Sequence, residues 1–140
     1  MTITVQAFLL CDGVVIDSHS SKPIVQGVFD QIAAAAYPAT HPNCSLFVRL
    51  LLEGETACNI GVAVLTPSGT RDLPIPQQSM KPAANGIVQA IINLQGLGLA
   101  EEGTYKFLLL INGIASAEFR LLAGRINPPD ALAVAKGPLH

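Results

Sequence analysis

Charge is scarce in this sequence. Only 13% of its 140 residues are charged, whereas soluble domains usually carry about 25%. Half of the residues are hydrophobic, and the mean hydropathy is +0.46. A chain of 14.6 kDa has a large surface relative to its volume and should need more charge than average. The shortage therefore predicts that part of the surface is buried in an assembly, and that the chain self-associates.

Basic excess, tryptophan and long apolar runs are also missing. The net charge is −2 and no tryptophan is present, so the usual electrostatic and aromatic surface for nucleic acid is lacking. No stretch reaches the roughly 18 uninterrupted apolar residues of a membrane span. The start, MTITVQAFLLCDG, has no basic segment before its apolar run, so we expect no signal peptide. These absences predict a protein with neither a nucleic-acid nor a membrane partner.

Cysteine and histidine are few, and their spacing does not suggest ligands. Cys11, Cys44 and Cys58 are an odd number without CxxC spacing, and they lie in or beside apolar runs. That placement predicts buried, reduced thiols and a reducing cytoplasm. The histidines form no HxH, HxxxH or HExxH pattern, and the serines around His19 form no GxSxG motif. We therefore expect no metal, cofactor or catalytic residue, and no enzymatic activity.

Two polar features allow more than one interpretation. Asp12, Asp17 and Asp30 could belong to a calcium site, but calcium takes six to eight oxygen ligands, and the loops expected opposite offer few more. We favour turn and strand-end roles for them. Arg49 stands alone in the apolar stretch FVRLLL, where it could extend to solvent, pair with Glu53 or face an interface. Pairing or an edge position is the favoured interpretation.

The apolar residues fall into short runs separated by Gly, Pro, Asn and Asp. This spacing predicts an all-β protein, a single antiparallel β-sandwich of about eight strands over residues 1–125. The alanines of 31–36 favour helix, but the run is too short to form one alone. The prolines of 71–86 predict a partly extended loop or an edge strand. Residues 126–140, which contain INPPD and ALAVAK, predict a short helical or extended tail that docks on an apolar surface.

Residues 103–122, GTYKFLLLINGIASAEFRLL, predict a β-hairpin with apolar side chains on both faces. A loop at 111–113 with a glycine bulge would pair Leu110 with Ile114 and Lys106 with Glu118. It would also place Phe107 and Phe119 together in the core. A slip by one residue would mix the two faces, so we favour this register.

The same register leaves several apolar residues on the second face of the hairpin. We expect them either to form an interaction surface or to be covered by another segment of the same chain. The predicted interaction residues, including two from the tail, are Leu108, Leu110, Ile114, Leu132 and Val134.

The order of several stretches resembles a family of small bacterial and phage-associated proteins known only as a domain of unknown function. The stretches are AFLLCD at 7–12, KPIVQGVFDQI at 22–32, YPATHP at 37–42, LFVRLLLEGE at 46–55, VLTPSG at 64–69, NLQGL at 93–97 and GTYKFLLLINGI at 103–114. The resemblance covers roughly residues 1–124. It implies a β-sandwich and no known activity, and it carries over no functional residue.

These observations favour a non-catalytic structural or protein-interaction module that self-associates. The alternative is a small-ligand-binding or enzymatic sandwich whose site is built from the 12–23, 37–43 and 67–86 loops. Those loops contain most of the His, Ser and Asp residues of the chain.

Overall fold

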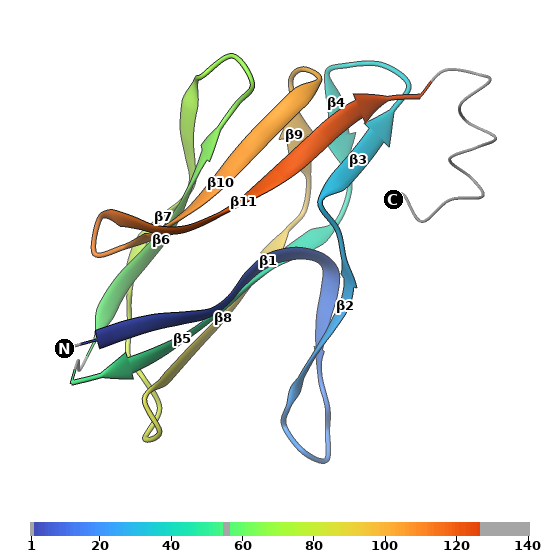
Figure 1. The fold of residues 1–140 in the computed structure, drawn as a ribbon. Helices are drawn as coiled ribbons and strands as arrows, with labels where there is room; N and C mark the ends of the chain where they lie inside the picture. Colours follow the sequence, from blue (N-terminus) through green and yellow to red (C-terminus); the bar gives the residue numbers. More distant parts are fainter. Residues whose placement is uncertain (1, 55–56, 127–140) are drawn as a thin grey trace.

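A computed structural model describes residues 2–54 and 57–126 (Figure 1). Within these residues the fold is all-β and contains no helix, which confirms the predicted class. It has eleven strands, more than expected, because several loops contain short strands of their own. The strands are β1 (Thr2–Ile16), β2 (Pro23–Val28), β3 (Gln31–Ala34), β4 (Ala39–His41), β5 (Cys44–Glu53), β6 (Cys58–Leu65), β7 (Arg71–Met80), β8 (Ile87–Leu94), β9 (Leu97–Leu99), β10 (Gly103–Ile111) and β11 (Ile114–Arg125).

Two sheets form the sandwich. The four-stranded sheet has the order β2-β1-β5-β8, and the five-stranded sheet has the order β3-β11-β10-β6-β7. A two-stranded ribbon, β4-β9, lies at one end (Figure 1). The β8 edge of one sheet and the β7 edge of the other lie on the same side of the sandwich, because Leu94 of β8 and Ile75 of β7 line one cavity between the sheets.

Alternation along the strands builds the core. In β5, Leu46, Val48 and Leu50 are at most 1% exposed and point between the sheets. From the opposite sheet, Phe107 is 1% exposed and stacks on Phe119 with ring centroids 4.7 Å apart. The predicted core role of the two phenylalanines is confirmed, with Phe119 half-buried at the margin.

The segment 31–36 forms a strand because a sheet edge is available to it. Asp30 accepts a backbone hydrogen bond from Leu122, and Ala34 accepts one from Ile126. These bonds make β3 a parallel neighbour of β11. The prediction of a wholly antiparallel sandwich is therefore wrong at this one pair of strands. The segment 37–43, treated as a loop in the sequence analysis, contains the short strand β4. The prediction for 71–86 holds in part, since β7 is an edge strand with two register shifts.

The 103–122 hairpin has the predicted faces except at its tip, and it does not have the predicted register. Asn112 and Gly113, with φ of 52° and 82°, form a tight two-residue turn that pairs Ile111 with Ile114. The extra residue is Ser116, between the pairs Leu110–Ala115 and Leu109–Ala117. The predicted register is therefore wrong by one residue at the tip, where Leu110 pairs with Ala115, and by two residues from the Leu109–Ala117 pair onward. Side chains alternate with a period of two, so the two-residue error keeps the predicted faces, whereas the one-residue error moves Ile114 to the core side and Ala115 to the second face.

The second half of β1 leaves the sandwich. From Asp12 onward β1 pairs only with β2, and this hairpin, residues 12–28, projects away from the sheets as an arm (Figure 1). Its tip is closed by Asp17, whose Oδ2 accepts hydrogen bonds from the backbone N–H and the hydroxyl of Ser20, both at 2.7 Å.

Candidate interaction site

The predicted interaction residues do not form one patch. Leu110 is only 4% exposed, Leu108 is half-buried, and Ile114 is 69% exposed. Ile114 pairs with the core residue Ile111, so it lies on the core side of the hairpin, beyond the rim of the sandwich. Leu132 and Val134 lie outside the described residues.

Leu110 is buried because the same chain covers it. Its cross-strand neighbour in β6 is Gly61, and β7 runs so close there that a Cβ on Gly61 would lie 2.9 Å from Cγ of Gln77. Contacts this short do not occur between real side chains, so the glycine is what allows β7 to approach. At Leu110 the second of the two expected explanations, cover by the same chain, is the correct one.

The three loops of the alternative ligand site do not converge. One shallow depression joins the first two loops to the end of β8, and its lining is Asp12, Gly13, Val14, Asn43, Cys44, Ser45, Asn93, Leu94 and Gln95. No residue of 67–86 lines it. The arm and the β6–β7 turn lie at opposite ends of the molecule (Figure 1).

The polar residues considered for chemistry are separated. Among residues 2–54 and 57–126, no group of three or more His, Cys, Asp or Glu could hold a metal ion. His41 lies against Phe29, with ring centroids 5.1 Å apart. Hydrogen bonds from Ser20 lower the pKa of Asp17, as expected of a turn residue.

The cysteines are buried, as predicted. Burial raises the pKa of Cys44 to about 11, and it also raises the pKa of Cys11. The Cys11 thiol donates a hydrogen bond to the carbonyl oxygen of Ser45 at 3.5 Å. Neither thiol is set up as a nucleophile, because a reactive cysteine needs a lowered pKa and access to solvent.

The feature that sequence reasoning missed is the free edge of β8. This eight-residue strand, IVQAIINL, is the last of its sheet and contains no charged residue and no proline. Natural sheets usually protect an exposed edge with charge, proline, a bulge or a covering loop. The β7 edge has Arg71, Pro76 and two register shifts, whereas β8 pairs with β5 in unbroken register.

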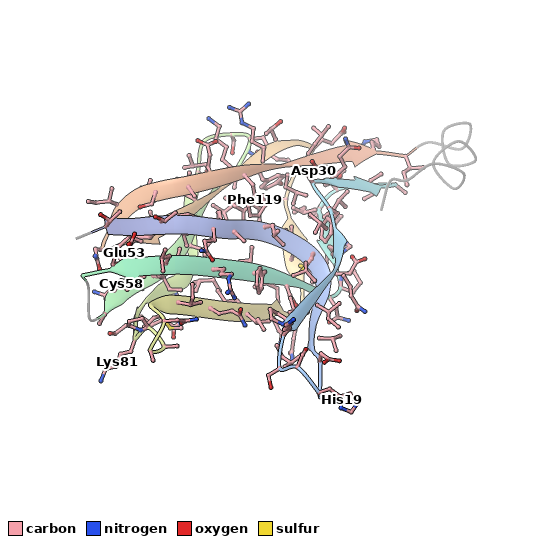
Figure 2. The ribbon with its side chains drawn as sticks, turned by 60° about the horizontal axis from the view of Figure 1, so that its bottom comes forward. His19, Asp30, Glu53, Cys58, Lys81 and Phe119 are labelled. Carbon is pink, nitrogen blue, oxygen red and sulfur yellow. The ribbon has the colours of Figure 1, made fainter. Side chains whose placement is uncertain are left out.

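The outer face of the four-stranded sheet continues from this edge. Its apolar residues are Ala7, Leu9, Phe47, Leu51, Ile87 and Ile91, which occupy outward positions of β1, β5 and β8. Figure 2 shows these three strands side by side with β8 at the margin. None of the three strands brings a charged side chain to the middle of this face except Arg49.

Arg49 does not pair with Glu53, as one interpretation of the sequence had it. Its Nε donates to Oε1 of Gln6 at 2.9 Å, and a terminal nitrogen donates to Oε1 of Gln89 at 2.6 Å. The guanidinium thus lies across the sheet between two neutral amides. The face therefore holds one cation whose donors are already partly used.

The arm adds exposed apolar surface beside the end of β8. Four of the six exposed large hydrophobic side chains among the described residues belong to it, namely Val15, Ile16, Ile24 and Val28, at 46–59% exposure. Asp12 to Val14 share a depression with Asn93 to Gln95, so the arm leaves the sandwich beside the end of β8. A single exposed hydrophobic residue means little, but a group beside a free edge favours contact with a partner.

An apolar cavity opens on the side of the sandwich where β7 and β8 form the edges. It has a volume of about 220 Å³ and lies between the sheets. Its lining carries no charged side chain and consists of Leu46, Val64, Thr66, Ile75, Leu94, Gly96, Leu97, Gly98, Leu99, Ala100, Tyr105 and Phe107. The Tyr105 hydroxyl is engaged with the backbone of Glu101.

No helix in the described part of the chain is long and apolar enough to cross a membrane. Comparison with known proteins gives a family without an assigned role: the model of a family of unknown function, DUF6941, matches residues 6–123. This agrees with the resemblance noted from the sequence. No curated protein matches the chain.

Two solved structures match the chain to different degrees. The first is the Pseudomonas fluorescens alkylpurine DNA glycosylase AlkC bound to DNA containing an abasic-site analogue, with a TM-score of 0.52 and 10% identity. The match covers 87% of this chain but only 30% of the glycosylase, and at this identity it shows the fold alone. The second is an immunoglobulin-like protein from Pseudomonas aeruginosa, with a TM-score of 0.35, 14% identity, and coverage of 88% and 97% of the two chains.

Proposed function

Because this chain belongs to the DUF6941 family, whose function is unknown, we propose its role from its own geometry. The chain is a non-catalytic protein-interaction module that self-associates through the side of the sandwich where β8 is free. The observation that carries this proposal is the β8 edge, eight residues without charge or proline and without a neighbour among the described strands.

A monomer with such an edge would be prone to uncontrolled strand pairing. Controlled self-association removes that hazard and buries the apolar outer face beside it. The low charged fraction of 13% supports the same role, because an assembled subunit needs less solvated surface than a free one. The buried thiols with raised pKa suit a reducing cytoplasm, where, in keeping with the bacterial and phage-associated resemblance, we place the module.

The test is the mass of the full chain in solution. Light scattering across micromolar concentrations should give at least twice the 14.6 kDa of a single chain. A mass of 14.6 kDa at every concentration would remove the proposal.

A second candidate function, small-ligand binding, is favoured by the apolar cavity and not by the polar loops. An engineered apolar cavity of about 150 Å³ takes up benzene, and the present one is larger, at about 220 Å³. Close packing is the norm in protein interiors, so an unfilled space of this size is unusual. The ligand would be a neutral compound with one ring or a short alkyl chain, since no charged side chain lines the space.

Benzene added to the methyl-labelled protein should shift the resonances of Leu46, Leu94 and Leu99. Val64→Phe should fill the cavity and abolish the shifts, whereas Val15→Phe on the exposed arm should leave them unchanged. If benzene leaves these methyl groups unmoved in the wild type, the cavity is not a binding site.

A further inference from the structure

The hydrogen bonds around β8 show which backbone groups a partner can use. The carbonyl oxygen of Gly86 accepts from the N–H of Leu52 at 2.8 Å, so this pair is of the hydrogen-bonded kind. In an antiparallel ladder such pairs alternate with non-bonded ones. The even-numbered positions of β8 therefore bond to β5, and the odd-numbered positions direct their N–H and C=O groups away from the sheet.

The start of the free edge is already occupied. The carbonyl oxygen of Ile87 accepts a hydrogen bond from the N–H of Ala83 at 2.9 Å, which also confirms that odd positions face outward. The outward positions that remain are Gln89, Ile91 and Asn93. Ile91 stands at the middle of this set.

We infer that β8 pairs with β8 of a second copy, antiparallel, with the two-fold axis at Ile91. The inference rests on the proposed self-association and specifies its geometry. Ile91 then lies opposite Ile91 of the second copy, and Gln89 lies opposite Asn93 of the second copy. The two four-stranded sheets become one continuous sheet, and all three free positions exchange their backbone hydrogen bonds.

This register is self-complementary, as a two-fold interface must be. On the outer face it sets isoleucine against isoleucine and amide against amide. An axis at Ala90 would set Gln89 against Ile91 and would need the Ile87 carbonyl that Ala83 occupies. An axis between two residues would mix the inner and outer faces.

A second copy fits this edge better than a charged peptide does. No residue of β8 carries a charge, so the strand meets its own copy without repulsion and offers no ion pair to a foreign strand. Continuity also matters: pairing at β8 extends the apolar row formed by Leu9, Phe47 and Ile91 directly into the same row of the second copy.

Lysine substitutions on the full chain test the position of the axis. Ile91→Lys places two ammonium groups directly opposite each other and should raise the dissociation constant of the dimer by about 100-fold or more. Ile87→Lys is the matched control, on the same strand and face and also half-buried. It should change that constant by less than about threefold, because its lysines lie far apart in the dimer. Circular dichroism establishes that both variants are folded.

Cysteine cross-linking tests the register independently. Opposed residues in a hydrogen-bonded antiparallel pair have Cα atoms about 5.5 Å apart, within disulfide range. Ile91→Cys should oxidise to a covalent dimer, whereas Ile87→Cys should not. Cys11, Cys44 and Cys58 are buried and should not compete.

The outcomes separate the inference from the proposal on which it rests. A monomeric wild type would remove both. A dimeric wild type whose Ile91→Lys variant dimerises equally well, and whose Ile91→Cys variant does not cross-link, would keep self-association but overturn the β8 register, and would direct attention to the arm.

Discussion

The backbone N–H of Leu52 donates to the carbonyl oxygen of Gly86 at 2.8 Å, and this one bond shows which residues of β8 are hydrogen-bonded to β5. The backbone N–H and C=O groups of every second residue after Gly86 bond to β5, and those of the residues between them point to solvent or to a partner. The edge thus has two classes of backbone position, which proline can distinguish.

Proline at adjacent positions of β8 should have different effects. Ala90→Pro removes a ladder hydrogen bond to Val48 and should lower the free energy of unfolding by about 1–3 kcal/mol, the cost of leaving a buried carbonyl without its donor. Ile91→Pro removes only an outward N–H and should cost much less, while abolishing self-association. Urea denaturation and light scattering on both variants measure the two effects. Equal destabilisation by the two prolines would contradict the assignment of Ala90, and not Ile91, as the residue that bonds to β5.

Substitutions in the 103–122 hairpin should destabilise the fold in proportion to the burial of the side chain that they replace. Phe107→Ala should lower the free energy of unfolding by about 3–5 kcal/mol, since the side chain is 1% exposed in the core. Leu110→Ser should also destabilise the fold, because Leu110 is only 4% exposed. Ile114→Ser, at 69% exposure, should leave the fold intact. Thermal unfolding compares the three, and a harmless Leu110→Ser would show that β7 does not cover this residue.

The pKa of Cys44 predicts a loss of stability at high pH. Burial raises it from 9.0 to about 11, so the folded thiol keeps its proton where the unfolded thiol loses it. The stabilisation is fully present below pH 9 and declines as pH rises toward 11. Chemical denaturation at pH 8 and pH 10.5 should show this decline in the wild type and a smaller one in Cys44→Ala. Identical pH profiles for the two proteins would remove the assignment.

Truncation after Ile126 separates two hypotheses of assembly. If β8 forms the interface, the shortened chain should keep the mass of the full-length oligomer, because Ile126 still bonds to Ala34 and the sandwich is complete. The sequence predicts a tail that docks on an apolar surface; if that surface belongs to a neighbouring copy, the mass should fall or aggregation should increase. Light scattering on the shortened and full-length chains decides between them.

The faces of the hairpin beyond its tip could be predicted from sequence because alternation is a local property. The bulge at Ser116 could not, because a distant strand helps to fix the turn. Asn112 donates to the carbonyl oxygen of Asn59, and Oδ1 of Asn112 accepts from the Asn59 N–H, at 2.8 and 2.9 Å. The strand β3 also depends on a segment distant in the chain, because hydrogen bonds with β11 override the helix preference of its alanines.

The candidate site was harder to predict than the fold class. The absence of charge in 87–94 is visible in the sequence, but it fits a central strand as well as an edge strand. Which one β8 is depends on the order of strands in the sheet, and that order is set by contacts far apart in the chain. Burial of Leu110 depended likewise on a long-range contact between Gly61 and Gln77.

Hydrogen exchange at the β8 amides reports directly on pairing between the β8 strands of two copies. Among the described residues no strand lies beside β8 to accept from the Ile91 N–H, whereas the Ala90 N–H points to β5. We predict that the Ile91 amide exchanges slowly at high protein concentration and quickly on dilution, while the Ala90 amide stays protected throughout. An Ile91 amide that exchanges quickly at every concentration, beside a protected Ala90, would contradict pairing at this edge.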